Sequence, residues 1–227
     1  MSTVLLFDID GTILLSGGAG RRAMVGAFAE RHGRPDAFEG MGFGGMTDPA
    51  IIRQGLRNVG ADDGPGAVDE MLQLYLARLE RELPLSETRL LAGVGELLER
   101  LRAEEGERVV VGLGTGNVQA GARLKLGRVG LGERFAFGGF GCDAEERAEL
   151  IRVGARRGAE RLGMPVDRCR VVVIGDTPLD VRAARGAKAE CLAVASGMSK
   201  HEELLAERPD HCCADLTDES VWGFLLD

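Results

Sequence analysis

A pair of aspartates near the start of the chain has the spacing of a site that binds a divalent cation. The segment Asp8-Ile9-Asp10-Gly11-Thr12 directly follows the apolar run Val4 to Phe7. Two carboxylates at the end of a strand can both lie over that end, and carboxylate oxygens are ligands that Mg²⁺ prefers. An ordinary Asp-Gly turn is the alternative. However, two acids beside a buried strand carry a desolvation cost that a bound ion would offset.

A glycine-rich turn in the middle of the chain predicts an anion-binding loop. The turn Gly112 to Asn117 reads Gly-Leu-Gly-Thr-Gly-Asn and overlaps the apolar run Val109 to Leu113. Glycines let backbone amides approach an anion, a following helix adds its dipole, and the Thr115 hydroxyl can donate to a phosphoryl oxygen. One alternative is a tight turn with Asn117 as a helix N-cap. The other is a dinucleotide-binding loop, for which the spacing and the acidic partner are missing.

A third polar turn, Gly175 to Asp180, follows the apolar run Val171 to Ile174. Asp176 stands at the expected strand end, and Asp180 lies one helical turn later on the same helix face. By itself this pattern is also typical of a helix cap. The three turns together are far more specific than any one of them.

The elements expected around these turns bring them to one place. Short apolar runs that alternate with helical patterns predict β-α-β units and a parallel sheet. Two further strands are expected at Glu190 to Ala195 and near His211 to Ala214. Ligands of such sheets bind beyond the carboxyl ends of the strands, so the three turns predict a single site. The expected fold class is α/β, with a doubly wound, Rossmann-like parallel sheet as its core.

A stretch of helical pattern without a convincing strand separates the first turn from the second. Helices are expected at 21–31, 48–59 and 66–83, with Asp48 as the N-cap of the second and Pro49 in its first turn. We interpret residues 17–89 as an inserted helical domain, and residues 1–16 and 90–227 as the core. The expected hinges are Gly17, Gly18 and Gly20 on one side and Ala92-Gly93 on the other.

Composition narrows the classes of partner. A formal net charge of -8 over 227 residues argues against a nucleic-acid surface, which needs clustered Lys and Arg. Five cysteines without a Cys-x-x-Cys pair favour reduced thiols in the cytosol over a disulfide framework. No signal peptide or run of transmembrane length is apparent. We therefore expect a cytoplasmic protein with no nucleic-acid or membrane partner; the oligomeric state stays open.

The motifs at 8–12, 114–117 and 175–180 together resemble those of the haloacid dehalogenase superfamily, most closely its phosphoglycolate phosphatase-like branch. The resemblance covers about residues 1–15 and 90–227, and the helical insert is similar to the helical cap of that superfamily. It implies a Mg²⁺-dependent phosphomonoesterase that acts on a small phosphorylated metabolite. A sugar phosphomutase of the same superfamily is the alternative enzyme. A phospho-accepting signalling module is the alternative from another class, although such modules are shorter and lack the insert.

The resemblance also implies a role for each acidic residue. Asp8 would be the nucleophile, and its carboxylate, the backbone carbonyl of Asp10 and the carboxylate of Asp176 would hold Mg²⁺. Asp10 would protonate the leaving oxygen and then activate the attacking water. Asp180 would orient the metal site, either as a ligand or through a residue that binds the metal.

The same resemblance implies how the transferring phosphoryl group is held. Thr115, with backbone amides near Gly116 and Ile9, would bind its oxygens, and Asn117 belongs to the same loop. Thr12 is expected to support its loop. In the insert, the loop 44–48 resembles a substrate-facing loop, and an ordinary helix start explains it at least as well. Arg21 and Arg22 could contact an anionic substrate, but solvated helix charges are the commoner explanation.

One position departs from the superfamily pattern, which usually has a lysine between the second and the last motif. Lys125 is the only lysine there, but it lies ten residues after Thr115, about 15 Å along a helix axis at 1.5 Å per residue. We therefore expect Arg147 to take the role. Asp143 and Glu146 match a capping box, which would put Arg147 in the first turn of a helix near the strand ends. A surface arginine is the alternative.

Overall fold

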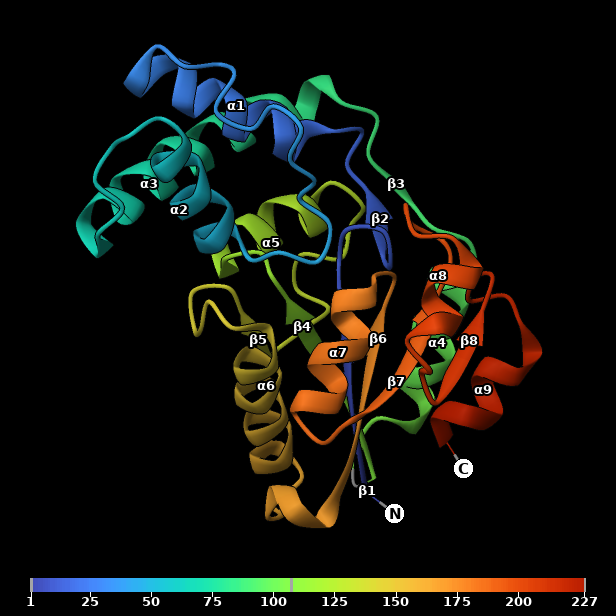
Figure 1. Cartoon of the computed structure of the whole chain (residues 1–227). Helices are drawn as coiled ribbons and strands as arrows, with labels where there is room; N and C mark the ends of the chain where they lie inside the picture. The colour runs from blue at the N-terminus through green and yellow to red at the C-terminus, as the bar shows by residue number, and fades with distance from the viewer. Residues whose placement is uncertain (1, 107, 227) are drawn as a thin grey trace.

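The protein is built on one parallel sheet of six strands. The computed structural model describes residues 2–106 and 108–226, and within them the strand order is β5-β4-β1-β6-β7-β8 with parallel pairing throughout (Figure 1). The strands are β1 (Ser2–Phe7), β4 (Val109–Thr115), β5 (Gly138–Phe140), β6 (Cys169–Gly175), β7 (Glu190–Val194) and β8 (His211–Cys213). The predicted α/β fold class is confirmed. The chain reaches β5 after the middle strand, and no strand was expected there because its three residues include two glycines.

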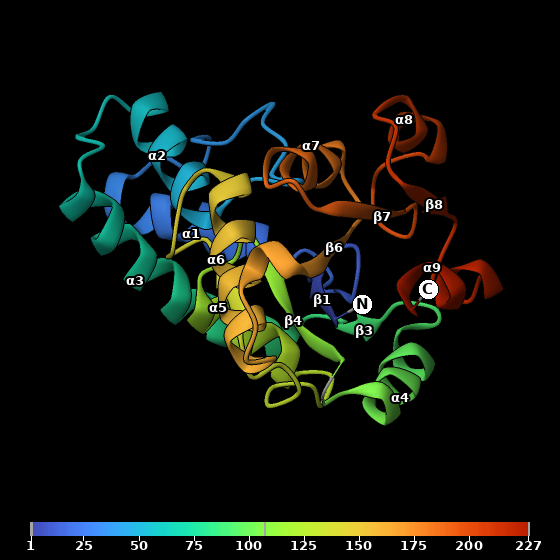
Figure 2. The same ribbon diagram turned by 90° about the horizontal axis from the view of Figure 1, so that it is seen from below.

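Helices cover both faces of the sheet. Strand residues alternate between two apolar layers: Leu5 and Phe7 of β1 face one layer, whereas Val4 and Leu6 face the other. Helices α4 (Val94–Glu104), α5 (Gln119–Gly127) and α9 (Glu219–Leu226) contribute to the first layer. Helices α6 (Arg147–Arg161), α7 (Pro178–Gly186) and α8 (His201–Ala206) contribute to the second. Figure 2 shows α7 and α4 on opposite sides of the strands.

Three further helices form a separate layer beyond the carboxyl ends of the strands. Helices α1 (Ala19–His32), α2 (Asp48–Asn58) and α3 (Pro65–Glu82) share their own apolar core, which includes Phe28, Ile52 and Tyr75. We call them the three-helix unit. The chain enters and leaves it through β2 (Leu14–Leu15) and β3 (Arg89–Leu90), which pair antiparallel. Short 3₁₀ turns at Leu83–Leu85 and Val166–Arg168 complete the elements, and no described helix has the length and apolarity needed to cross a bilayer.

Three helix starts differ from expectation. Thr47, not Asp48, is the N-cap of α2, and its hydroxyl accepts from the Ala50 amide at 3.4 Å. Glu146, not Asp143, caps α6, and its carboxylate accepts from the amides of Ala148 and Glu149. Val118 precedes α5 in the N-cap position, which frees the Asn117 side chain for other contacts. The cap lies one residue from the expected position in α2 and α5 and three residues from it in α6, because several residues nearby could serve.

Candidate active site at the carboxyl edge of the sheet

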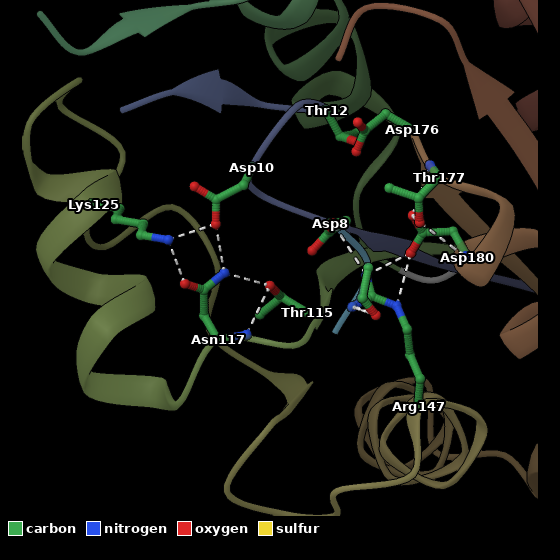
Figure 3. Close-up of polar contacts among 11 residues, drawn as sticks. Asp8, Asp10, Thr12, Thr115, Asn117, Lys125, Arg147, Asp176, Thr177 and Asp180 are labelled. Carbon is green, nitrogen blue, oxygen red and sulfur yellow. Dashed lines mark hydrogen bonds and ion pairs between the residues drawn. The ribbon is translucent and has the colours of Figure 1, made fainter. Parts of the chain in front are cut away.

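Three aspartates from two strand ends converge on one point. Asp8 follows β1, Asp176 follows β6, and Asp180 lies in the first turn of α7 (Figure 3). One carboxylate oxygen of each lies within 4.8 Å of the others, and all three residues are buried. The expectation that these turns meet at one edge of the sheet agrees with this geometry. An all-oxygen donor set of this kind suits Mg²⁺.

The electrostatics of this cluster also fit a divalent cation. Burial raises the pKa of Asp176 to about 8, with Asp180 and Asp8 adding to the shift through charge repulsion. Burial likewise raises the pKa of Asp8 to about 6, against the opposing charge of Arg147. Three carboxylates and one guanidinium leave a charge of -2 when all are ionised, which one Mg²⁺ would neutralise. The residues present therefore fit the metal that the family resemblance implies.

Glycines give Asp176 the space that it occupies. A Cβ at Gly11 would lie 2.2 Å from Asp176 Oδ2, and one at Gly197 would lie 1.8 Å from the same oxygen. Gly11 also has a φ of +86°, which a side chain would disfavour. Thr12, which was expected to support its own loop, donates a hydrogen bond to Asp176 Oδ1 at 3.3 Å and so joins that loop to the end of β6.

Arg147 lies inside the site rather than on the surface. It begins α6, and its guanidinium reaches Asp8 Oδ2 at 3.0 Å and Asp180 Oδ1 through Nε at 2.9 Å. Its Nη1 donates to the Gly45 carbonyl of the three-helix unit at 3.1 Å. Burial opposes its charge, but Asp180 and Asp8 outweigh burial and raise its pKa. The side chain is 9% exposed, so the alternative of a solvated surface arginine is wrong.

Asp10 turns away from the three clustered acids. Its Oδ2 accepts from Lys125 Nζ at 2.6 Å and from Asn117 Nδ2 at 2.9 Å (Figure 3). The carboxylate of Asp10 is thus separated from the cluster of Asp8, Asp176 and Asp180, and the expected metal contact of Asp10 was through its backbone carbonyl. Asp10 keeps 41% of its side chain exposed, which leaves it open to the cavity above.

The expectation that Lys125 lies too far from the site was wrong. Residues 116–118 form a turn, and α5 begins only at Gln119, so Lys125 is in the second turn of that helix. A long helical side chain also extends back toward the N-terminus of its helix. Lys125 Nζ donates to Asn117 Oδ1 at 2.7 Å as well as to Asp10, and the residue is 4% exposed. Asp10 and Asp48 raise its pKa although burial acts in the opposite direction.

The middle turn places its polar groups beside the nucleophile candidate. Thr115 is fully buried, and its hydroxyl accepts from Asn117 Nδ2 at 2.9 Å and lowers the pKa of Asp8 by hydrogen bonding. Gly116 has no room for a side chain, because a Cβ there would lie 2.2 Å from the Met46 carbonyl oxygen. Asn117, offered by the sequence as a possible cap, instead joins Thr115, Asp10 and Lys125 in one hydrogen-bonded row.

A cavity of about 640 Å³ lies above these groups, between the sheet edge and the three-helix unit. Its lining includes Asp8, Asp10 and Asp176 from below and the loop 42–46 from above. Arg21 also borders it, but its terminal nitrogens donate to the carbonyls of Met41 and Phe38 at 2.8 and 3.0 Å. Arg22 pairs with Glu82 instead.

The match to known families agrees with this geometry. A family model described as haloacid dehalogenase-like hydrolase matches residues 3–188. The chain belongs to this family. It is an enzyme of the phosphatase type. Comparison with curated proteins finds no match.

Solved structures of this family share the fold. CbbY from Rhodobacter sphaeroides, in complex with phosphate, has a TM-score of 0.70 at 19% identity, over 96% of each chain. A hydrolase from Pseudomonas syringae has a TM-score of 0.69 at 21% identity, over 96% of this chain and 95% of the other. A predicted phosphoglycolate phosphatase from Haemophilus somnus 129PT has a TM-score of 0.67 at 15% identity, over 96% of each chain. Identities this low show the fold and no substrate.

Two residues of the site escaped sequence reasoning. Lys125 was set aside because of its distance from Thr115. Tyr75, which lines the cavity, was not considered because it is part of an apolar helix face. The available signal was that Lys125 is one of only three lysines and lies in the helix that directly follows the Gly-Thr-Gly-Asn turn. No comparable signal exists for Tyr75, whose position depends on how α3 lies over α5.

Proposed function

We propose that this protein is a Mg²⁺-dependent phosphomonoesterase that hydrolyses a small phosphorylated metabolite through an aspartyl phosphate on Asp8. The observation that carries the proposal is that the carboxylates of Asp8 and Asp10 lie apart from each other. Asp8 lies among Asp176, Asp180 and Arg147, whereas Asp10 is held apart by Lys125 and Asn117. One carboxylate is thus placed to attack and the other to move a proton.

In the first step, an oxygen of Asp8 attacks the phosphorus of the substrate, and the bond from phosphorus to the leaving oxygen breaks. Asp10, protonated at this stage, gives its proton to that oxygen. Arg147, at 3.0 Å from Asp8, and the Thr115 hydroxyl offset the negative charge that gathers on the phosphoryl oxygens. Mg²⁺ held by Asp8, Asp176 and the Asp10 carbonyl would supply the remaining positive charge. Asp180 would orient the metal site through Arg147, which contacts both Asp180 and Asp8.

In the second step, water attacks the phosphorus of the aspartyl phosphate while Asp10 takes a proton from it. The bond between phosphorus and Asp8 then breaks, which returns the free carboxylate and releases inorganic phosphate. The three-helix unit would serve as a cap that excludes bulk water during transfer and reopens for product release. Its contacts with the sheet edge, such as the bond from Arg147 to the Gly45 carbonyl, support this role.

One substrate to be tested is 2-phosphoglycolate, because a structural neighbour is described as a predicted phosphoglycolate phosphatase. We place the reaction in the cytoplasm, since all five cysteines are free thiols.

Turnover of p-nitrophenyl phosphate, with Mg²⁺ and with excess chelator, tests the proposal. We expect hydrolysis only with the metal, and a loss of about 10⁴-fold or more in kcat for Asp8→Asn, because the nucleophile is removed. Metal-independent turnover, or an active Asp8→Asn protein, would contradict the proposal. Stable phosphorylation without turnover would favour a phospho-accepting module, and transfer of the phosphoryl group to a sugar rather than to water would favour a phosphomutase.

A further inference from the structure

A second polar cluster borders the cavity beside Asp10, where the three-helix unit meets α5. Lys125 from α5 is joined there by Tyr75 from α3 and Asp48 from α2, and all three line the cavity. Tyr75 is 1% exposed, and among the described residues nothing hydrogen-bonds to its hydroxyl. Lys125 has three N–H groups, of which Asp10 and Asn117 accept two. Buried polar groups normally find partners, so both side chains have hydrogen-bonding capacity left for a ligand.

The space in front of these two groups is kept open by Gly20 of α1. A Cβ at this position would lie 3.5 Å from Lys125 Nζ and 3.8 Å from Tyr75 Oη. The ammonium and the phenol therefore approach the same small volume, which no side chain of residue 20 fills. Gly20 itself borders the cavity.

The charges around this volume favour a neutral ligand group over an anion. The charges of Asp10 and Asp48 both act on Lys125, so two carboxylates face one ammonium. Burial, with the nearby Asp48 and Asp10, raises the pKa of Tyr75 well above its usual value, so its hydroxyl remains a donor. A carboxylate or second phosphate placed here would meet two acids. A hydroxyl, which both donates and accepts, suits an ammonium, a phenol and a carboxylate at once.

We propose that Tyr75, Lys125 and Asp48 bind a hydroxyl of the substrate alcohol close to the ester oxygen, so that the preferred substrates are monophosphates of polyols or sugars. The proximity to the ester oxygen follows from Asp10, which accepts from Lys125 at 2.6 Å and faces the leaving group in the proposed reaction. This inference rests on the proposed phosphatase function and specifies its substrate class.

Matched substrates test the inference on the whole protein. We expect kcat/KM for 2-hydroxyethyl phosphate to exceed that for ethyl phosphate by about 10- to 100-fold, because only the former satisfies the buried groups. It should also exceed that for 2-phosphoglycolate, which has the same carbon chain with a carboxylate in place of the hydroxyl carbon. Turnover of p-nitrophenyl phosphate is measured first, and its absence would refute the phosphatase function itself.

Two variants locate the effect. The hydroxyl preference is the ratio of kcat/KM for 2-hydroxyethyl phosphate to kcat/KM for ethyl phosphate. Tyr75→Phe should reduce this ratio by about tenfold. Gly20→Ala should reduce it too, since the added methyl occupies the space of the ligand hydroxyl while making only ordinary contacts with Lys125 and Tyr75. Gly20 is in helix α1, where alanine is the better helix former, so the thermal midpoint of the Gly20→Ala protein should not fall below that of wild type.

Met71→Leu, a buried change one turn away on α3 and outside the cavity lining, is the matched control and should keep the ratio. Active wild-type protein with a ratio near one would overturn the inference and leave the phosphatase function standing. A ratio that Met71→Leu lowers as much as Tyr75→Phe, or a preference for 2-phosphoglycolate, would overturn it as well.

Discussion

At the scale of single residues, the site depends on two buried cations that are each shared between acids and other acceptors. Arg147 joins Asp8 to Asp180, and Lys125 joins Asp10 to Asn117. The planar guanidinium can contact two carboxylates and a carbonyl together, which suits a position between several acceptors. The ammonium of Lys125 acts as a point charge that fixes one oxygen of Asp10. Each cation thus positions a different carboxylate for a different step.

Arg147→Met should be both destabilising and inactivating. It leaves Asp180 buried without its cation, so we expect a loss of about 3 kcal/mol in the free energy of unfolding of the metal-free protein. It should also lower kcat by about 10²- to 10³-fold, as loss of a donor to the transition state does. Urea unfolding and steady-state kinetics measure the two effects. Arg152→Met, on the half-exposed side of the same helix, is the control, and equal losses in both variants would refute the assignment.

Lys125→Met should affect poor leaving groups more than good ones. Without its ammonium, Asp10 loses one of two partners and with it the alignment needed to protonate the leaving oxygen. We expect kcat for ethyl phosphate to fall by about 10²-fold, and the rate of the first turnover of p-nitrophenyl phosphate to fall much less, because nitrophenolate leaves without a proton. Stopped-flow and steady-state assays measure both. The same factor for the two substrates would contradict a role through Asp10.

At the scale of elements, the first turn of α2 attaches the three-helix unit to the sheet edge. The amide of Asp48 donates to the Gly116 carbonyl at 2.8 Å, and its Oδ2 accepts from the Val118 amide at 2.8 Å. Thr47 donates to the Glu145 carbonyl at 3.2 Å, and Arg53 pairs with the Glu145 side chain. The start of one helix thus meets the start of another, α5, and the cavity is enclosed where they join.

The carboxylate of Asp48 should make this attachment depend on pH. Burial raises the pKa of Asp48 to about 6, above the usual 3.8 of an aspartate, so the folded protein binds the proton more tightly than the unfolded chain. The stability that this group contributes is therefore fully present below about pH 4 and is lost as pH rises through 6. Asp48→Asn keeps an acceptor for Val118 without the charge.

We expect Asp48→Asn to raise the free energy of unfolding relative to wild type by about 1–2 kcal/mol at pH 7.5 and to change it little at pH 4. Urea unfolding at both pH values measures the difference. A stabilisation that is the same at pH 4 and pH 7.5 would show that the charge of Asp48 is not its source.

At the scale of the whole molecule, the sheet gathers acidic side chains from distant parts of the chain. Asp8 and Asp176 are far apart in sequence, but β1 and β6 pair in register from Ser2–Cys169 to Phe7–Ile174. The two strands therefore end side by side at the same edge of the sheet. Packing on both faces holds this edge rigid, so the stability of the whole core offsets the electrostatic repulsion between the clustered carboxylates. A ligand that neutralises them should therefore stabilise the entire fold.

Mg²⁺ at millimolar concentration should raise the thermal midpoint of the wild-type protein by several degrees, since a shift of about 1 kcal/mol corresponds to roughly 2–4 °C for a chain of this size. Asp176→Asn removes one proposed ligand and should abolish most of the increase. Differential scanning fluorimetry with Mg²⁺ and with Na⁺ at matched ionic strength measures both. An equal increase in the two salts, or one unchanged in Asp176→Asn, would speak against a site at these acids.

The sequence alone was sufficient for the parts that depend on local pattern. Apolar runs ending in polar turns predicted β1, β4 and β6, and the parallel arrangement then brought Asp8, Thr115 and Asp176 to one edge. Helical periodicity predicted α1, α2 and α3, although the cap of α2 proved to be Thr47. These features are encoded in neighbouring residues, so they can be inferred without knowing what packs against them.

Which cation contacts which acid depends on the three-dimensional packing of the chain. A continuous helix from Thr115 would place Lys125 too far away, but the turn before α5 and the length of the side chain bring its ammonium to Asp10. Tyr75 reads as core, and only the placement of α3 over α5 brings its hydroxyl to the cavity. Such contacts join residues far apart in the chain, and their geometry depends on helix ends, rotamers and packing angles that no local pattern specifies.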